Sequence, residues 1–73
     1  MDLIEMIEKA RRALDPPMTS GHPAYRMASS DETELMRKVS LALYDLDGRM
    51  WLVGAGDRPG QLRLTYTERT DAD

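Results

Sequence analysis

The chain has 73 residues, with ten lysine and arginine side chains against thirteen aspartates and glutamates, and a formal net charge of −3. A chain this short buries only about 60% of the surface that its unfolded form exposes, and it has no cysteine for disulfides or thiolate metal ligands, which leaves association as its means of added stability. No apolar run reaches the roughly 18 residues of a membrane span, and the N-terminus lacks a signal-peptide pattern, so we expect a cytoplasmic protein without membrane contacts.

The first predicted element is an amphipathic helix over about residues 2–14. Its apolar residues recur at helical spacing on one stripe: Leu3, Ile7, Ala10 and Leu14. Asp2 is the predicted N-cap, and the helix should end at Asp15, because the residue before a proline is pushed out of the α region. About twelve residues form a marginal helix in water, so this stripe must pack on another element.

Residues 15–30 are predicted to form a loop, since three prolines, a glycine and several serines and threonines fall there. The loop contains His22, the only imidazole of the chain. No carboxylate or nucleophile lies beside it in the sequence, and we interpret it as a solvated loop histidine. A short fourth strand or a helical turn within 25–37 is left open.

Residues 38–45 fit two structures. The alternation of apolar and other residues from Val39 to Tyr44, followed by Asp47-Gly48, is typical of the first strand of a β-hairpin. The competing pattern is a capping box at Ser29 or Asp31, followed by a helix that ends at Gly48. The apolar residues of that helix would share one face: Leu35, Val39, Ala42, Leu43 and Leu46. We favour the strand.

Two further strands follow at about 49–55 and 61–68, on either side of the turn signal at 57–60. We therefore predict a single small α+β domain over 1–73. In it, the N-terminal helix packs on a three-stranded antiparallel β-meander, and a frayed tail covers 69–73. The alternative fold is two helices plus a C-terminal β-hairpin.

The loop lengths set the register of the predicted sheet. A two-residue loop at 47–48 pairs Tyr44 with Trp51, and a four-residue loop at 57–60 pairs Trp51 with Tyr66 and Val53 with Leu64. One face then suits a core beneath the N-terminal helix. It carries Ala42, Tyr44, Trp51, Val53, Ala55, Leu62, Leu64 and Tyr66.

The opposite face is the predicted partner-binding surface. It carries five apolar residues and two arginines: Val39, Leu41, Leu43, Met50, Leu52, Arg37 and Arg63. A sheet face exposed to water should be mostly polar, so we expect something to cover this one. The candidates are the 16–30 segment with Met18, Tyr25 and Met27, a second copy of the chain, or another protein.

The sequence contains no complete motif for catalysis or ligand binding. The acidic residues at 31, 32 and 34 suit a helix start, where the macrodipole favours negative charge. The Asp45-x-Asp47-Gly48 pattern has its glycine too early for a calcium loop and Gly56 where the closing glutamate should stand. We expect no enzymatic activity, no cofactor, no metal and no small-molecule substrate.

The function predicted from these features is that of a small non-enzymatic protein-interaction module. Such a module would regulate or inhibit a larger protein, for example in the manner of phage or plasmid proteins that modulate host machinery, or it would self-associate. Interfaces favour methionine and arginine, and the chain has six methionines and eight arginines against two lysines. The weaker alternative is a nucleic-acid-binding protein in which Tyr44, Trp51 and Tyr66 stack on bases, and the negative net charge opposes it.

Overall fold

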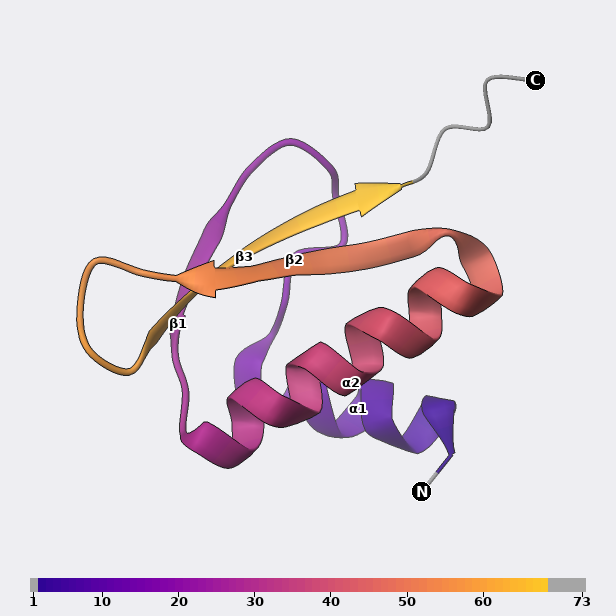
Figure 1. The fold of residues 1–73 in the computed structure, drawn as a ribbon, viewed down its shortest axis with the longest axis horizontal. Helices are drawn as coiled ribbons and strands as arrows, with labels where there is room; N and C mark the ends of the chain where they lie inside the picture. Colours follow the sequence, from indigo (N-terminus) through magenta and orange to yellow (C-terminus); the bar gives the residue numbers. More distant parts are fainter. Residues whose placement is uncertain (1, 69–73) are drawn as a thin grey trace.

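The computed structural model describes residues 2–68, which form two helices and a three-stranded antiparallel sheet (Figure 1). The elements follow one another as α1 (Leu3–Leu14), β1 (Ala24–Met27), α2 (Ser30–Asp47), β2 (Arg49–Ala55) and β3 (Gln61–Glu68). The predicted α+β class, the N-terminal helix and the antiparallel three-stranded sheet are confirmed. The predicted tail, 69–73, lies outside the described residues.

Helix α1 begins where its capping residue predicts. The Asp2 side chain accepts a hydrogen bond from the backbone N–H of Glu5 at 2.8 Å, which pairs one of the four donors that a helix N-terminus leaves free. The helix ends at Asp15, which adopts the left-handed conformation with φ of 44°. Ala10 and Leu14, from the predicted stripe, are buried.

The predicted strand at 38–45 is wrong, because these residues form the second half of α2. Ser29 and Glu32 form a complete capping box, in which each side chain accepts a hydrogen bond from the backbone N–H of the other, at 2.8 and 3.1 Å. Gly48 ends the helix with φ of 71° and donates its N–H to the carbonyl of Tyr44 at 2.8 Å. The Asp47-Gly48 pair is thus a helix C-terminus and not a hairpin turn.

The helix prevails in this segment because its buried positions follow helical spacing. The buried residues of α2 are Met36, Val39, Ser40 and Leu43, which recur at i, i+3, i+4 and i+7 and so share one stripe. A strand would instead have placed Val39 and Leu43 on the same side as Leu41, which is 64% exposed. The alternative prediction, two helices and a C-terminal hairpin, describes this part of the chain.

The third strand of the sheet is β1, from the segment predicted as a loop with an optional short strand. Its pairing with β3 places Ala24 opposite Leu64 and Arg26 opposite Leu62. Because the strand order is β1-β3-β2 and both pairings are antiparallel, β1 and β2 run parallel with β3 between them. Helix α2 connects the two outer strands, which makes a split β-α-β arrangement.

The predicted hairpin register of β2 and β3 is confirmed. Trp51 lies opposite Tyr66, Val53 opposite Leu64, and Ala55 opposite Leu62. A four-residue loop at 57–60 fixes this parity, since a one-residue slip would turn every side chain to the other face.

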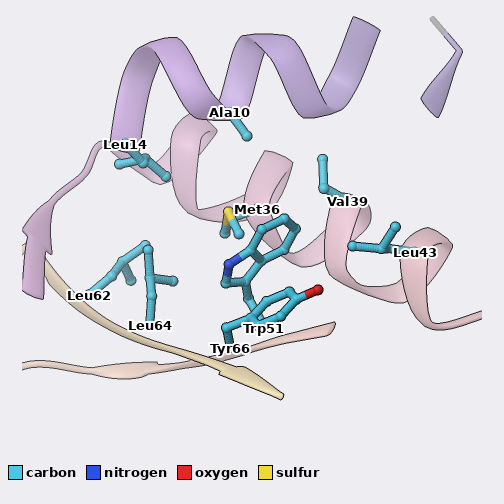
Figure 2. Close-up of a cluster of buried hydrophobic side chains, with 9 residues drawn as sticks. All are labelled: Ala10, Leu14, Met36, Val39, Leu43, Trp51, Leu62, Leu64 and Tyr66. Carbon is cyan, nitrogen blue, oxygen red and sulfur yellow. The ribbon is translucent and has the colours of Figure 1, made fainter. Parts of the chain in front are cut away.

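The core lies between the sheet and the two helices, which are on the same side of it (Figures 1 and 2). It consists of nine residues: Ala10, Leu14, Met36, Val39, Leu43, Trp51, Leu62, Leu64 and Tyr66. The rings of Trp51 and Tyr66 are tilted against each other with centroids 5.6 Å apart, a favourable aromatic arrangement. The Trp51 indole N–H also donates to the carbonyl of Pro17 at 2.6 Å, which ties the α1–β1 loop to the core.

Candidate partner-binding surface

The seven predicted partner-binding residues do not lie on one surface. Val39 and Leu43 are 0% and 5% exposed and belong to the core, so their placement at a surface is wrong. The reason is that these positions lie one helical turn apart on the face of α2 that packs against the sheet. Arg63 lies in the central strand β3 and is exposed between the buried Leu62 and Leu64, so it points to the side of the sheet opposite the core.

The other four predicted residues surround a hollow of about 230 Å³ between α2 and β2. Arg37 and Leu41 come from α2, one turn apart, and Met50 and Leu52 come from β2. Ser40, Trp51 and Val53 complete its lining. We call this hollow the α2–β2 groove. Leu41 and Leu52 thus line the same groove because α2 packs beside β2, and not because residues 38–45 pair with β2 as a strand.

The α2–β2 groove runs along the free edge of β2, because β2 is an outer strand of the sheet. The N–H of Gly56 donates to the carbonyl of Gln61 at 2.9 Å. Opposed residues of an antiparallel pair alternate between hydrogen-bonded and non-hydrogen-bonded pairs. The even-numbered residues of β2 therefore bond to β3, and the backbone groups of the odd-numbered residues face the free edge.

Ser40 closes part of this edge. Its hydroxyl donates to the carbonyl of Trp51 at 2.6 Å and accepts from the Trp51 N–H at 3.0 Å. Both contacts agree with this alternation, because Ser40 binds the backbone N–H and C=O groups of Trp51, which point away from β3. The next odd-numbered residues, Val53 and Ala55, have no such partner among residues 2–68. The edge is thus closed at Trp51 and open at Val53 and Ala55.

The second feature of the surface is the side of the sheet opposite the helices, which we call the open face. Its exposed apolar side chains are Tyr25, Met27 and Leu52, at 42%, 62% and 52%. Arg63 lies opposite Tyr25 in the register and so stands among them. The 16–30 segment is one of the three candidate covers, but its Tyr25 and Met27 do not lie over this face, because β1 pairs with β3 and makes these two residues part of it.

The cations of this surface differ in their partners. Arg49, at the start of β2, forms an ion pair with Asp47 and also donates to the Tyr66 hydroxyl. Hydrogen bonding to Asp47, and secondarily to Tyr66, raises the pKa of Arg49. Within the described range 2–68, the side chains of Arg37 and Arg63 form no ion pair or hydrogen bond. These two guanidinium groups are therefore available to an anionic group of a partner.

Among residues 2–68, no three histidine, cysteine, aspartate or glutamate side chains lie close enough to hold a metal ion. His22 is exposed in the loop between α1 and β1. A larger hollow, of about 520 Å³, has a lining that, among residues 2–68, comes from α2 alone. No helix in the described part of the chain is both long and apolar enough to cross a membrane.

Sequence reasoning missed several residues of this surface. Tyr25 and Met27 alternate with Ala24 and Arg26, a period of two that indicates a strand, but four residues between loops give a weak signal. Ser40 carried no local signal, because its hydrogen bonds reach across 11 positions to Trp51. Comparison of the chain with protein-family models, with curated proteins and with solved structures found no match.

Proposed function

We propose that this chain is a non-enzymatic protein-interaction module that binds a larger protein through the α2–β2 groove and the adjoining open face. The observation that carries the proposal is the continuity of exposed apolar side chains from α2 across β2. Leu41 is 64% exposed and Leu52 is 52% exposed, and both line the same groove. A monomer rarely leaves large apolar side chains grouped in this way unless they meet a partner.

The residue types of the surface fit a protein partner. Methionine, tyrosine and arginine are enriched in protein interfaces, and Met27, Tyr25 and Arg63 supply one of each on the open face. The groove is smaller than the roughly 300–1,000 Å³ of typical small-molecule sites, at about 230 Å³. A module of this kind acts by occupying a surface of its partner, so its effect would be regulation or inhibition.

The proposal predicts that Leu52→Asp weakens binding of the natural partner by at least about tenfold. The new carboxylate would stand at the centre of the apolar surface, between the groove and the open face. The measurement is quantitative affinity capture from lysate of the source cells, with the wild type and the variant as bait. Because the Leu52 side chain is half exposed, the variant should fold, which circular dichroism checks.

The matched control is Ile4→Asp, which places the same charge on an apolar side chain that is 70% exposed on α1. This variant should retain every partner, because Ile4 lies outside the groove and the open face. If folded Leu52→Asp protein captured the same partners in the same amounts as the wild type, the nominated surface would not be the interface.

The nucleic-acid alternative receives less support from the position of its aromatic residues. Of its three proposed stacking residues, Trp51 and Tyr66 are 1% and 2% exposed, inside the core, and offer no ring to a base, whereas Tyr44 is 38% exposed. Titration with labelled single- and double-stranded DNA and RNA at about 50 mM salt tests it, since phosphate contacts are strongest at low salt. Tight binding there would favour this alternative over a protein partner.

A further inference from the structure

We propose that the open part of the β2 edge binds an extended strand of the partner, and that this strand carries an acidic side chain that pairs with Arg37. The inference rests on the proposed function and specifies how the partner engages. Its basis is the coincidence of three features at one place: backbone groups of Val53 and Ala55 that have no partner among residues 2–68, an apolar groove, and the Arg37 guanidinium, which makes no ion pair with those residues.

The unpaired backbone groups determine the conformation of the ligand. The N–H and C=O groups of Val53 and Ala55 point away from β3. The reason is that the register and the Gly56–Gln61 hydrogen bond make the even-numbered residues of β2 the ones that bond to β3. The N–H and C=O groups of these two residues alternate as donors and acceptors along the edge, and the backbone of a second extended chain pairs with them. A helix would leave them unpaired, since its own backbone groups are bonded internally.

The groove beside the edge determines the side chains of the ligand. Side chains of an added strand alternate between the two faces of the sheet. On the open-face side they would meet Met50 and Leu52, and on the helix side they would meet Leu41 and Arg37. We therefore expect apolar residues of the ligand on the open-face side, and an acidic residue on the helix side within reach of the Arg37 guanidinium.

Charge favours a foreign strand over a second copy of this chain. Self-association through the same edge would pair β2 with β2, and β2 has the sequence RMWLVGA, which contains no acidic residue. Its only charged residue, Arg49, already pairs with Asp47. A second copy would thus leave Arg37 without a counter-charge from the added strand, whereas an acidic strand supplies one.

The experiment is selection of peptides from a displayed library of random sequences of roughly ten residues, a length that spans an edge strand. Selected peptides are synthesised with a fluorescent label, and their affinity is measured by fluorescence anisotropy. We expect them to alternate apolar and polar residues, with an acidic residue at a constant position. Failure to select any peptide, or selection of sequences without this pattern, would overturn the proposal.

Backbone pairing is tested by Ala55→Pro, which removes the N–H that would donate to the added strand. Proline is tolerated in an edge strand where the N–H faces outward, so no bond to β3 is lost. Affinity for the selected peptides should fall at least about tenfold, while Ala55→Ser, which keeps the N–H, should bind like the wild type. N-methylation of alternate peptide residues gives a second measurement on the unaltered protein: methyl groups on one parity should abolish binding, and those on the other should not.

The acidic contact is tested by a charge exchange. Arg37→Glu should weaken the acidic peptides at least about tenfold, and peptides in which lysine replaces the acidic residue should recover affinity for the variant. Lys38→Glu is the matched control, because it makes the same charge change at the next position of α2 without lining the groove. Equal losses of peptide affinity for both variants would mean that the effect comes from the net charge of the protein alone, which would overturn the Arg37 contact.

Two outcomes separate this inference from the proposed function. If Ala55→Pro keeps the natural partner while Leu52→Asp loses it, the surface is an interface but strand addition is wrong. If both variants keep the partner, both proposals are wrong. A dimer of the wild type in light scattering that Ala55→Pro dissociates would show that a second copy occupies the edge, which overturns the foreign strand.

Discussion

Val39→Asp should unfold the protein, whereas Leu41→Asp should leave it folded. Val39 is 0% exposed in the core, and burial of an unpaired carboxylate there would cost on the order of 4 kcal/mol or more. A domain of this size has about 3–5 kcal/mol of stability to lose. Leu41 lies two positions away on the exposed side of α2, where a surface substitution changes stability by about 0.5 kcal/mol or less.

The comparison of these two variants distinguishes a helix from a strand at 38–45. Residues two apart point to the same side of a strand but to well-separated sides of a helix. A strand would therefore give both variants the same response. Far-UV circular dichroism and urea denaturation measure the outcome, and similar unfolding or similar stability of the two variants would contradict the helix α2.

Ser40→Ala should lower the free energy of unfolding by about 2 kcal/mol, within the roughly 1–3 kcal/mol that an unsatisfied buried polar group costs. Ser40 is 3% exposed, and its hydroxyl pairs both the N–H and the C=O of Trp51. The substitution removes a single oxygen and creates almost no cavity, so the loss comes from the two orphaned backbone groups. Urea denaturation measures it.

Ser30→Ala is the control for this prediction. Ser30 is exposed in the first turn of the same helix, and its side chain makes no hydrogen bond among the described residues. Its replacement should change stability by about 0.5 kcal/mol or less. Equal stability of Ser40→Ala and Ser30→Ala would mean that the Trp51 backbone does not depend on the serine, and that the edge of β2 is open along its length.

The C-terminal hairpin could be predicted residue by residue because its information is local. The turn at 57–60 fixes the parity, and the alternation of Leu62, Leu64 and Tyr66 marks the core side. Both strands have the predicted bounds, 49–55 and 61–68. Helix α1 could be predicted for the same reason, because Asp2 and the Asp15-Pro16 pair mark its two ends locally in the sequence.

The segment 38–45 could not be assigned correctly because two periods overlap in it. Val39, Leu41 and Leu43 alternate as in a strand, while Met36, Val39 and Leu43 recur as in a helix. Ser40 obscured the helical stripe, because a polar residue at a core position is explained only by its distant partner Trp51. An Asp-Gly pair serves equally as a hairpin turn and as a helix end, so it did not decide.

The candidate surface was predicted only in part, because some of its residues lie in the hairpin and the others depend on how distant elements pack. Met50, Leu52 and Arg63 have the predicted orientation because the hairpin parity was right. Arg37 and Leu41 reach the same neighbourhood on a helix that packs beside the β2 edge. The free backbone groups of Val53 and Ala55 depend on strand order, and no local pattern indicates that β1 pairs with β3 and leaves β2 at the edge.

The most direct test of the β2 edge as a binding site is backbone amide hydrogen exchange of the free protein, measured by nuclear magnetic resonance. The amides of Leu52 and Gly54 should exchange slowly because they bond to β3, and that of Trp51 should be slow because of Ser40. The amides of Val53 and Ala55 should exchange fast, which would leave them available to an added strand. Protection of Val53 and Ala55 as strong as that of Leu52 and Gly54 would contradict the open edge.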